Sequence, residues 1–500
     1  MRVESAFGIH IGNTNACLGV YKEGRSDVVA NDDGDRTTPA TVSFLNGGKE
    51  VVVGLAAKQG RFRNAKSTVI NNKRLLLDSF DLSKHKSDPY AKVIHEAKTY
   101  KHNIHFEDNA VLKVTPDIIH QHLLKYIVDI AESRIEEDSK DVVITVPTSM
   151  SLEKRLLVSN CAKKAGFNLL QMISEPAAAC LAYNLGQSDN NQQDIVLVYR
   201  VGGIGTEATL VRSVSGVYSI LGSCIEDLGT GGTAISQLFV QYLANEFKRK
   251  YKLDPLESKR SVFKLENAAE TVKHVLSTLD TAPCHIESLY EGIDFNHSVT
   301  RARFNNELSK LMPTLLRPIH RVLELANVHI NKVNKVILCG GSCKIPAIQS
   351  NVSSLFPNAE ILNTINPDEV IAKGAADQAA LLTNSWTESG KSFSLKALCG
   401  SLIFSKDGEE KEVLIPTLTP IPVRKSHHFS NLEGNVLRVQ LSLVNDQGEN
   451  VDITELSLND LEEDSKISLS AHIYRDGHLH LTLTDKKTNK CDSTTFEILS

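Results

Sequence analysis

The 500-residue sequence has few long apolar runs, no paired cysteine motif and no large excess of either charge. Apolar runs such as Ile195–Tyr199 are far shorter than the roughly 20 residues that a membrane-spanning helix needs. The segment Met1–Phe7 carries both charges and lacks the apolar stretch of a secretion signal. We therefore expect neither a membrane protein nor a secreted one.

The cysteines and the charge balance further restrict the cellular compartment and the kinds of binding partner that we expect. The nine cysteines are odd in number and form no CxxC pair, which favours reduced thiols in the cytosol or nucleus. Lys and Arg total 55 against 60 Asp and Glu, giving a formal net charge of −5. A general DNA or RNA binder needs clustered positive charge, so direct nucleic-acid binding is not expected.

Histidines occur in close pairs, but no cysteine or carboxylate at metal-ligand spacing accompanies them. Two ligands do not complete a metal site, so no metal centre is expected and these side chains are predicted to be solvent-exposed. The pairs are His102/His105, His120/His122, His427/His428 and His478/His480.

A faint internal repeat indicates the architecture. Two polar or Gly-rich turns, 13–15 and 202–205, lie about 190 residues apart, and each joins two β-rich segments typical of a hairpin. The flanking segments are Ala6–Gly12 with Ala16–Tyr21, and Asp194–Val201 with Ala208–Val211. Similar spacing relates the strand Val142–Val146 to Lys335–Leu338, and a small-residue helix after Glu175 to one containing Gly374. The pattern predicts two similar α/β lobes, with chance strand–turn–helix coincidence as the alternative.

Helical periodicity appears between these landmarks. It predicts helices over Asp117–Arg134, Ser258–Leu279 and Arg303–Asn327. Pro313 and Pro318 are expected to interrupt or bend the last of these.

The composition changes after residue 382. Residues 1–382 form the predicted two-lobed α/β domain, 383–394 a polar linker, and 395–500 an all-β domain of short alternating strands. In that last domain, Ser468–Tyr474 and His478–Thr484 flank an Asp-Gly turn, which is a strong hairpin signal.

The Gly-rich hairpin turns suggest a cleft for phosphates, because glycine lets backbone amides approach phosphate oxygens closely. On its own this signal is weak. The sequence has no GxxxxGK[ST] loop and no GxGxxG after a first strand, so P-loop and dinucleotide-binding folds are unsupported.

Several separated motifs together resemble the 70-kDa heat-shock protein (chaperone) family over almost the whole chain. They are Asn31–Pro39 (NDDGDRTTP), Asp141–Pro147 (DVVITVP), Glu175–Tyr183 (EPAAACLAY), Ser288–Asp294 (SLYEGID), Arg301–Phe304 (RARF), Gly340–Pro346 (GGSCKIP) and Asn366–Glu369 (NPDE). The resemblance implies an actin-like, hexokinase-like two-lobed ATPase fold followed by a β-sandwich peptide-binding domain. The sequence stops at Ser500, where the family continues into a helical lid, so a short, lid-less member is expected.

The resemblance also implies an ATP site whose adenosine side is retained. Glu270, Lys273 and Ser277 lie at i, i+3 and i+7 and match residues that contact base and ribose in the family. The adenine-side set is completed by Gly340, Gly341, Ser342, Lys344 and Asp368. Lys344 replaces an arginine that stacks on the base, and an ammonium stacks less well than a guanidinium.

On the phosphate side, the resemblance is partial. The retained residues are Gly12, Thr14, Gly202, Gly203, Gly231, Gly232, Lys73 and Glu175. The divergent ones are His10 and Arg200, which stand where the family has aspartates, together with Asn13, Ile204, Gly205 and Glu207. Asn13 remains a candidate nucleotide contact.

These replacements predict a site that has lost the groups positioning metal and attacking water, and so binds ATP with little or no hydrolysis. Arg200 and a protonated His10 beside Lys73 would make the cleft more positive. Such a cleft is expected to attract triphosphate without strict magnesium dependence, with Arg200 partly replacing the charge of the metal. An unused pocket is the alternative.

Coupling to partners is expected to be altered. Pro147 and Arg155 match the family's allosteric relay, but Trp386–Leu398 lacks the apolar linker that transmits nucleotide state. Gln171 stands where the family has an arginine that binds the J-domain aspartate, and a glutamine cannot make that charge-assisted bond. A J-domain protein is therefore expected to dock through another surface, in a stable complex.

The resulting hypothesis is a cytosolic pseudo-ATPase co-chaperone that acts with a J-domain protein at the ribosome, on nascent polypeptides. The ribosome link rests on the resemblance alone. The alternatives are an ATP-hydrolysing chaperone with a modified site, an actin-like or sugar-kinase enzyme, and an interaction scaffold that binds no nucleotide.

Overall fold

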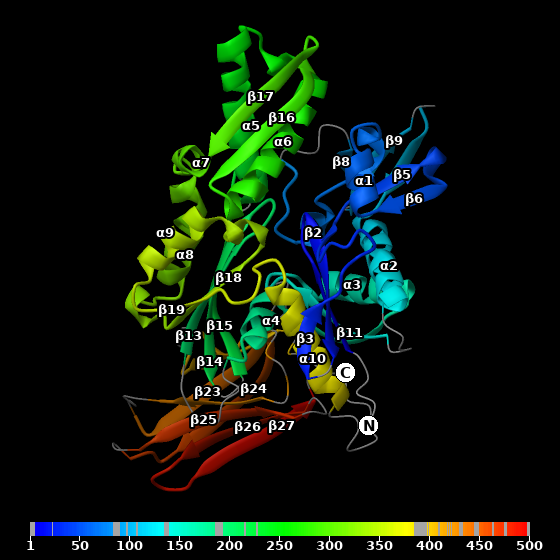
Figure 1. Ribbon diagram of the computed structural model, residues 1–500. Helices are drawn as coiled ribbons and strands as arrows, with labels where there is room; N and C mark the ends of the chain where they lie inside the picture. Colours follow the sequence, from blue (N-terminus) through cyan, green and yellow to red (C-terminus); the bar gives the residue numbers. More distant parts are fainter. Residues whose placement is uncertain are drawn as a thin grey trace.

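The computed structural model shows two α/β lobes side by side above a β domain (Figure 1). It describes residues 6–22, 24–83, 91–96, 99–106, 109–134, 140–185, 194–214, 217–226, 229–384, 398, 400–408, 411–417, 419, 421, 423–429, 434–444, 450–462, 465–474 and 478–497. Within these residues, none of the helices combines the length and the apolar character needed to cross a membrane.

The central sheets of the two lobes have the same construction. In lobe I the strand order is β12-β11-β1-β2-β3, and in lobe II it is β19-β18-β13-β14-β15. In both, the first hairpin is antiparallel and its first strand pairs in parallel with a strand from later in the chain. The lobe I strands are β1 (Ala6–Ile11), β2 (Asn15–Lys22), β3 (Arg25–Val28), β11 (Asp141–Val146) and β12 (Asn168–Ser174). The lobe II strands are β13 (Asp194–Val201), β14 (Thr206–Val214), β15 (Val217–Glu226), β18 (Lys335–Cys339) and β19 (Glu360–Leu362).

Smaller sheets and helices extend each lobe. The remaining lobe I strands are β4 (Thr38–Pro39), β5 (Val42–Leu45), β6 (Glu50–Val53), β7 (Thr68–Val69), β8 (Lys92–Glu96), β9 (Thr99–His105) and β10 (Val111–Val114). Its helices are α1 (Leu55–Gly60), α2 (Pro116–Arg134), α3 (Leu152–Ala165) and α4 (Glu175–Ala182), with the 3-10 turn η3 (Asn72–Leu76). Lobe II adds β16 (Thr281–Tyr290), β17 (Ile293–Thr300), α5 (Gly231–Tyr251), α6 (Lys259–Thr278), α7 (Arg301–Leu308), α8 (Met312–Leu325), the 3-10 turn η6 (Gly341–Lys344), α9 (Pro346–Leu355) and α10 (Val370–Asn384).

Two helices of small residues join the lobes at the centre of the molecule. A Cβ placed on Gly374 of α10 would lie 1.7 Å from the Ala178 carbonyl oxygen of α4. One placed on Gly8 of β1 would lie 2.1 Å from the Ala376 backbone nitrogen. Only glycine permits contacts this close, so α10 packs tightly against both α4 and the lobe I sheet.

The predicted helices form, with one division. α2 and α6 match the expected segments to within a residue at each end. The third expected helix is two, because a turn at residues 309–311 separates α7 from α8, and Pro313 occupies the first turn of α8. Proline is tolerated there because the first amides of a helix have no intrahelical acceptor.

The lobes also touch at their outer ends. The rings of Phe62, after α1, and Phe263, on α6, lie 5.4 Å apart between centroids. The guanidinium of Arg260 lies 6.0 Å from the centre of the Phe62 ring. Helices α1 and α6 lie in the part of the lobes that is away from the β domain (Figure 1).

The C-terminal region is a sandwich of two antiparallel sheets, ordered β21-β20-β23-β24 and β22-β25-β26-β27. Its strands are β20 (Ser401–Lys406), β21 (Glu412–Ile415), β22 (Val423–His428), β23 (Val436–Val444), β24 (Asn450–Asn459), β25 (Ile467–Ile473), β26 (His478–Asp485) and β27 (Cys491–Glu497). The predicted hairpin is confirmed, since β25 pairs with β26 in antiparallel register. Lys425 of β22 donates a hydrogen bond to Ser219 of β15 at 3.4 Å, which attaches the sandwich to lobe II.

The prediction that the paired histidines are solvent-exposed is wrong for two of them. His102 is buried and its Nε2 lies 2.9 Å from the Asn72 Oδ1 atom. His120 is also buried, and neither of its ring nitrogens has a hydrogen-bond partner among the described residues. Burial lowers the pKa of each to about 4, so both are neutral at pH 7.

Candidate functional site

The two hairpin turns at the ends of the central sheets touch each other. In the first turn, Gly12 donates from its backbone nitrogen to the Asn15 carbonyl at 2.8 Å, and in the second, Gly202 donates to Gly205 at 2.9 Å. A Cβ on Gly203 would lie 2.1 Å from the Thr14 methyl group, so the second turn rests directly on the Thr14 side chain. The sequence alone does not show this contact between turns.

The amino end of α5 closes over the second turn. Gly232 and Thr233 donate their backbone N–H groups to the carbonyls of Gly202 and Gly203, at 2.8 and 2.7 Å. Gly231 has a φ of +79°, and a Cβ there would lie 2.7 Å from the Gly205 backbone nitrogen. Glycine is required at this position both for its backbone conformation and for the close approach.

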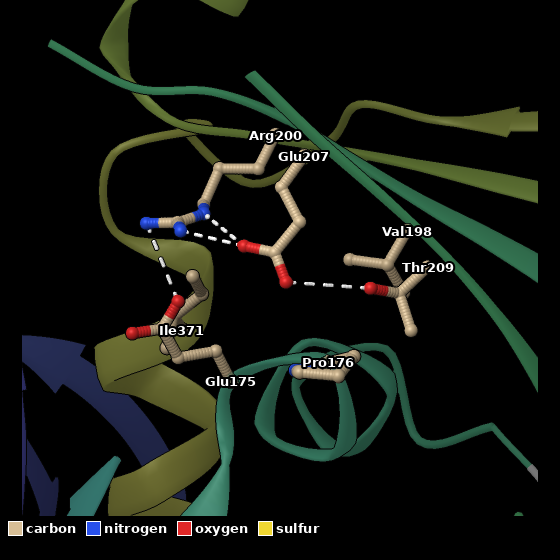
Figure 2. A pocket seen from close by; sticks show the side chains of 7 residues that line it. All are labelled: Glu175, Pro176, Val198, Arg200, Glu207, Thr209 and Ile371. Carbon is tan, nitrogen blue, oxygen red and sulfur yellow. Dashed lines mark hydrogen bonds and ion pairs between the residues drawn. The ribbon is translucent and has the colours of Figure 1, made fainter. Parts of the chain in front are cut away.

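An ion-pair network lies at the base of the turns. Arg200 and Glu207 are direct cross-strand partners on β13 and β14, and Arg200 Nη2 lies 2.6 Å from Glu207 Oε2. Arg200 Nη1 also lies 3.3 Å from Glu175 Oε2. Figure 2 shows the guanidinium between the two carboxylates, with Thr209 on the side of Glu207 that faces away from Arg200. One guanidinium therefore connects lobe II to the first residue of α4.

The same glutamate binds a lysine of lobe I. Lys73, on η3, donates to Glu175 Oε1, and both side chains are buried. Burial acts to raise the pKa of Glu175, but Arg200 and Lys73 together hold that pKa well below its usual range. Asn13 supports this arrangement, because its Oδ1 accepts from the Arg74 backbone nitrogen at 2.9 Å and so holds η3 against the first turn.

His10 is neutral. Burial lowers its pKa to about 3, outweighing the opposing effect of Glu175, and the nearby Lys73 and Arg200 lower it further. Its Nδ1 lies 2.9 Å from the Thr145 hydroxyl of β11. The expectation that His10 adds positive charge to the cleft is therefore wrong.

The expected excess of positive charge from Arg200 is also absent from this network. Lys73 and Arg200 contribute two positive charges, and Glu175 and Glu207 contribute two negative ones, which cancel. The physical reason is pairing: a buried guanidinium is stable only when carboxylates compensate for the water that it has lost.

The adenosine-side residues on α6 form a second network. Lys273 Nζ lies 2.6 Å from Glu270 Oε2 and 3.3 Å from the Gly232 carbonyl, and it is 6% exposed. Burial lowers the pKa of Lys273 against the attraction of Glu270. Ser277, one turn later, donates to the Lys273 carbonyl at 3.0 Å. The helix thus presents these three side chains next to the start of α5.

The loop around residue 340 completes this side. A Cβ on Gly232 would lie 2.8 Å from the Ser342 hydroxyl, which brings η6 against α5. Gly340 donates from its backbone nitrogen to the Pro367 carbonyl at 2.7 Å, while a Cβ on Gly341 would meet no atom within 4 Å. Lys344 Nζ lies 2.7 Å from Asp368 Oδ2. Open space above Gly341 and a paired Lys344 therefore border the same loop.

The expected coupling residues are only partly described. Pro147 directly follows β11, and Arg155 is buried on α3. Gln171 is buried on β12, where its Oε1 accepts from Gln378 Nε2 of α10 at 2.8 Å. Most of the expected linker, Trp386–Leu398, lies outside the described residues.

Sequence reasoning missed three partners in the site. Ser236 on α5 donates to Glu270 Oε2 at 2.6 Å and accepts from Lys273 at 3.0 Å. Thr145 pairs with His10, and Thr209 lies 3.4 Å from Glu207 Oε1. Ser236 follows Gly232 by one helical turn, and that spacing was a usable signal.

The pairing of Arg200 with Glu207 could also have been predicted from the sequence. In a hairpin whose turn is 202–205, these two positions face each other across the strands. The ion pair between Arg200 and Glu175 could not have been predicted in this way, because the two residues belong to different lobes.

Comparison with known proteins agrees with this architecture. The family model described as Hsp70 protein matches residues 6–498. Heat shock 70 kDa protein 14-B of Xenopus laevis is 38% identical over 508 residues, covering 99% of both chains. Heat shock 70 kDa protein 14 of Danio rerio is 38% identical over 505 residues, again covering 99% of each chain. That of Bos taurus is 38% identical over 523 residues, covering 99% of this chain and all of its own. The chain therefore belongs to the 70-kDa heat-shock protein family.

Proposed function

We propose that this chain is a chaperone or co-chaperone that binds ATP with little or no hydrolysis. In this proposal it acts in the cytosol with a J-domain protein at the ribosome and assists the folding of nascent chains. The observation that carries the proposal is the position of Arg200, held between Glu175 at 3.3 Å and Glu207 at 2.6 Å. A guanidinium in this place removes both carboxylates from any role in positioning metal or water.

Magnesium fits this site poorly. Mg²⁺ is bound in proteins by oxygen ligands, chiefly carboxylates, together with water. Here Glu175 is bound by Lys73 and Arg200, and Glu207 by Arg200. No cluster of His, Cys, Asp and Glu suited to a metal ion is present among the described residues. Metal-assisted hydrolysis therefore lacks a positioning site within the described part of the chain.

The adenosine side fits a nucleotide better. Glu270, Lys273 and Ser277 share one face of α6, and the carboxylate of Glu270 is held by three partners on α5 and α6. The space above Gly341 is open beside this face. These residues, with Lys344 and Asp368, would hold the base and ribose of ATP.

The partner surface is proposed to lie away from Gln171. Its side chain is 6% exposed and bonded to Gln378, so it offers a docking protein little area. A neutral amide here cannot supply the charge-assisted bond that an arginine makes. A J-domain protein that binds elsewhere need not dissociate with each nucleotide cycle, which favours a stable complex.

The direct test is a single-turnover incubation of the purified protein with labelled ATP, with and without a J-domain protein. Intact ATP recovered on the protein supports the proposal. Bound ADP formed at a rate that the His10→Asp and Arg200→Asp substitutions do not raise overturns it and favours an ATP-hydrolysing chaperone. Recovery of no nucleotide favours an interaction scaffold.

A further inference from the structure

We infer that the site recognises the adenosine half of its ligand and does not distinguish ATP from ADP, AMP or adenosine. This inference rests on the proposed nucleotide binding and specifies its ligand class. In chemical terms, the ligand is an adenine nucleoside with any number of phosphates. The chain would then hold a nucleotide without sensing its γ-phosphate.

The first support is that the cations of the phosphate side are already paired. Lys73 donates to Glu175, and Arg200 binds both Glu175 and Glu207. If Arg200 turned toward a phosphate, it would leave two buried carboxylates facing that phosphate. The repulsion of like charges in a buried setting would cancel the gain.

The second support is that four backbone donors, two in the turns and two at the start of α5, are already used. The amides of Gly12 and Gly202 are bonded within their own turns, and those of Gly232 and Thr233 are bonded to the second turn. A helix amino end normally attracts anions through such free amides. At the amino end of α5, the carbonyls of Gly202 and Gly203 accept the hydrogen bonds that an anion would otherwise accept.

The third support is the contact between the two turns. Gly203 packs so closely on Thr14 that an added Cβ would fall 2.4 Å from the Thr14 hydroxyl oxygen. A phosphate chain running between the turns would have to separate them. Separation would strain the hairpin whose register holds Arg200 opposite Glu207.

The adenosine side, in contrast, offers polar groups beside open space. Lys273 and Glu270 are fixed to each other, and Ser342 and Gly341 lie along the adjoining loop. These groups contact a nucleoside equally well whatever its phosphate count. A charge-assisted bond to a phosphate is typically worth at least about tenfold in affinity, so a site without one shows a smaller difference.

Isothermal titration of the full chain with adenosine, AMP, ADP and ATP, with magnesium and with EDTA, tests the inference. We expect the four dissociation constants to agree within about tenfold and magnesium to have no effect on them. A dissociation constant for ATP more than about tenfold below that of adenosine overturns the inference, with or without magnesium. So does a selective loss of ATP affinity in Lys58→Ala, because Lys58 of α1 is an exposed cation near Lys273.

A doubly substituted chain tests whether a preference for ATP over adenosine can be created. Arg200→Asp combined with His10→Asp places four carboxylates around Lys73, which we expect to create magnesium-dependent preference for ATP over adenosine of at least about tenfold. The matched control is Arg317→Asp, since Arg317 also pairs with a glutamate, Glu226 at 3.2 Å, but lies on α8. It is expected to leave all four constants unchanged. A phosphate preference that the double substitution does not raise above the unsubstituted chain overturns the inference.

Failure of the inference and failure of the proposed function give different results. If none of the four ligands binds, nucleotide binding itself is absent and both are wrong. If ATP binds far more tightly than adenosine and stays intact, the proposed function stands and the inference alone is wrong.

Discussion

Arg200 Nη1 on β13 lies 3.3 Å from Glu175 Oε2 at the start of α4, so this ion pair joins lobe II to lobe I beneath the two hairpin turns. Glu175 also accepts from Lys73, and Arg200 also binds Glu207. The four side chains form a chain of alternating charge in which each member depends on its neighbours. Its consequences for stability and binding can be measured.

Glu175→Gln should strongly destabilise the protein. The substitution leaves Lys73 and Arg200 as buried cations without their shared anion, and breaking a buried pair typically costs about 3–5 kcal/mol. We expect a loss of about 3 kcal/mol in the free energy of unfolding, measured by urea titration. Glu360→Gln is the control, because Glu360 is largely exposed and lies 3.8 Å from Lys335. A loss below about 1 kcal/mol for Glu175→Gln would show that the network does not stabilise the fold.

Stability should fall as the pH drops from about 6.5 toward 4. The pKa values of His10, His102 and His120 are lowered in the folded state, to about 3, 4 and 4, so below pH 6.5 the unfolded chain binds more protons. Above pH 6.5, these three histidines therefore do not lower the free energy of unfolding. Between pH 7 and pH 5, each histidine should lower the free energy of unfolding by about 1–2 kcal/mol.

His120→Leu isolates one of these contributions. The change removes a buried imidazole whose nitrogens have no partner among the described residues, so it should stabilise the chain at pH 5 and reduce the pH dependence. Urea titrations at both pH values measure this. His320→Gln, at an exposed position, is the control substitution. An unchanged slope in His120→Leu would mean that His120 is not titrating with folding.

Lys344→Arg should tighten nucleotide binding. Lys344 is 41% exposed at its side chain and paired with Asp368 at 2.7 Å. A guanidinium can keep that pair and also stack on the adenine, which is worth about 0.5–1 kcal/mol at an exposed site. We expect about two- to fivefold tighter binding of ADP by titration calorimetry. Lys332→Arg, exposed and outside the site, serves as the control. Weaker binding in Lys344→Arg would place the base elsewhere.

Gln171→Arg should destabilise the chain without creating turnover. The new charge would be buried beside Gln378, at a cost of about 2–3 kcal/mol, and under the proposed function Arg200 and His10 would still prevent hydrolysis. The double substitution with Gln378→Glu should recover stability by supplying a carboxylate. Thermal unfolding and ATP turnover with a J-domain protein measure both effects. J-domain-stimulated turnover in Gln171→Arg would instead show that this one position had silenced the site.

The sequence by itself determined the local structure and part of the site. Alternating apolar residues and turn residues specify the hairpins, and helical periodicity specifies α2 and α6. Small residues at Gly374 and Ala178 permit the close helix crossing. The register of β13 against β14 follows from the turn length, and it already places Arg200 opposite Glu207. Apart from the crossing of α10 with α4, each of these features depends on residues near one another in the chain.

Only the tertiary structure decided the charge of the site. Replacing two aspartates with His10 and Arg200 suggested a more positive cleft, yet burial keeps His10 neutral and Glu175 compensates Arg200 from another lobe. The burial of His102 and His120 could likewise not be predicted from the sequence. The physical reason is that a charge is set by how much water it loses and which opposite charges lie within a few ångströms. Both depend on residues that are far apart in the sequence and meet only when the chain folds.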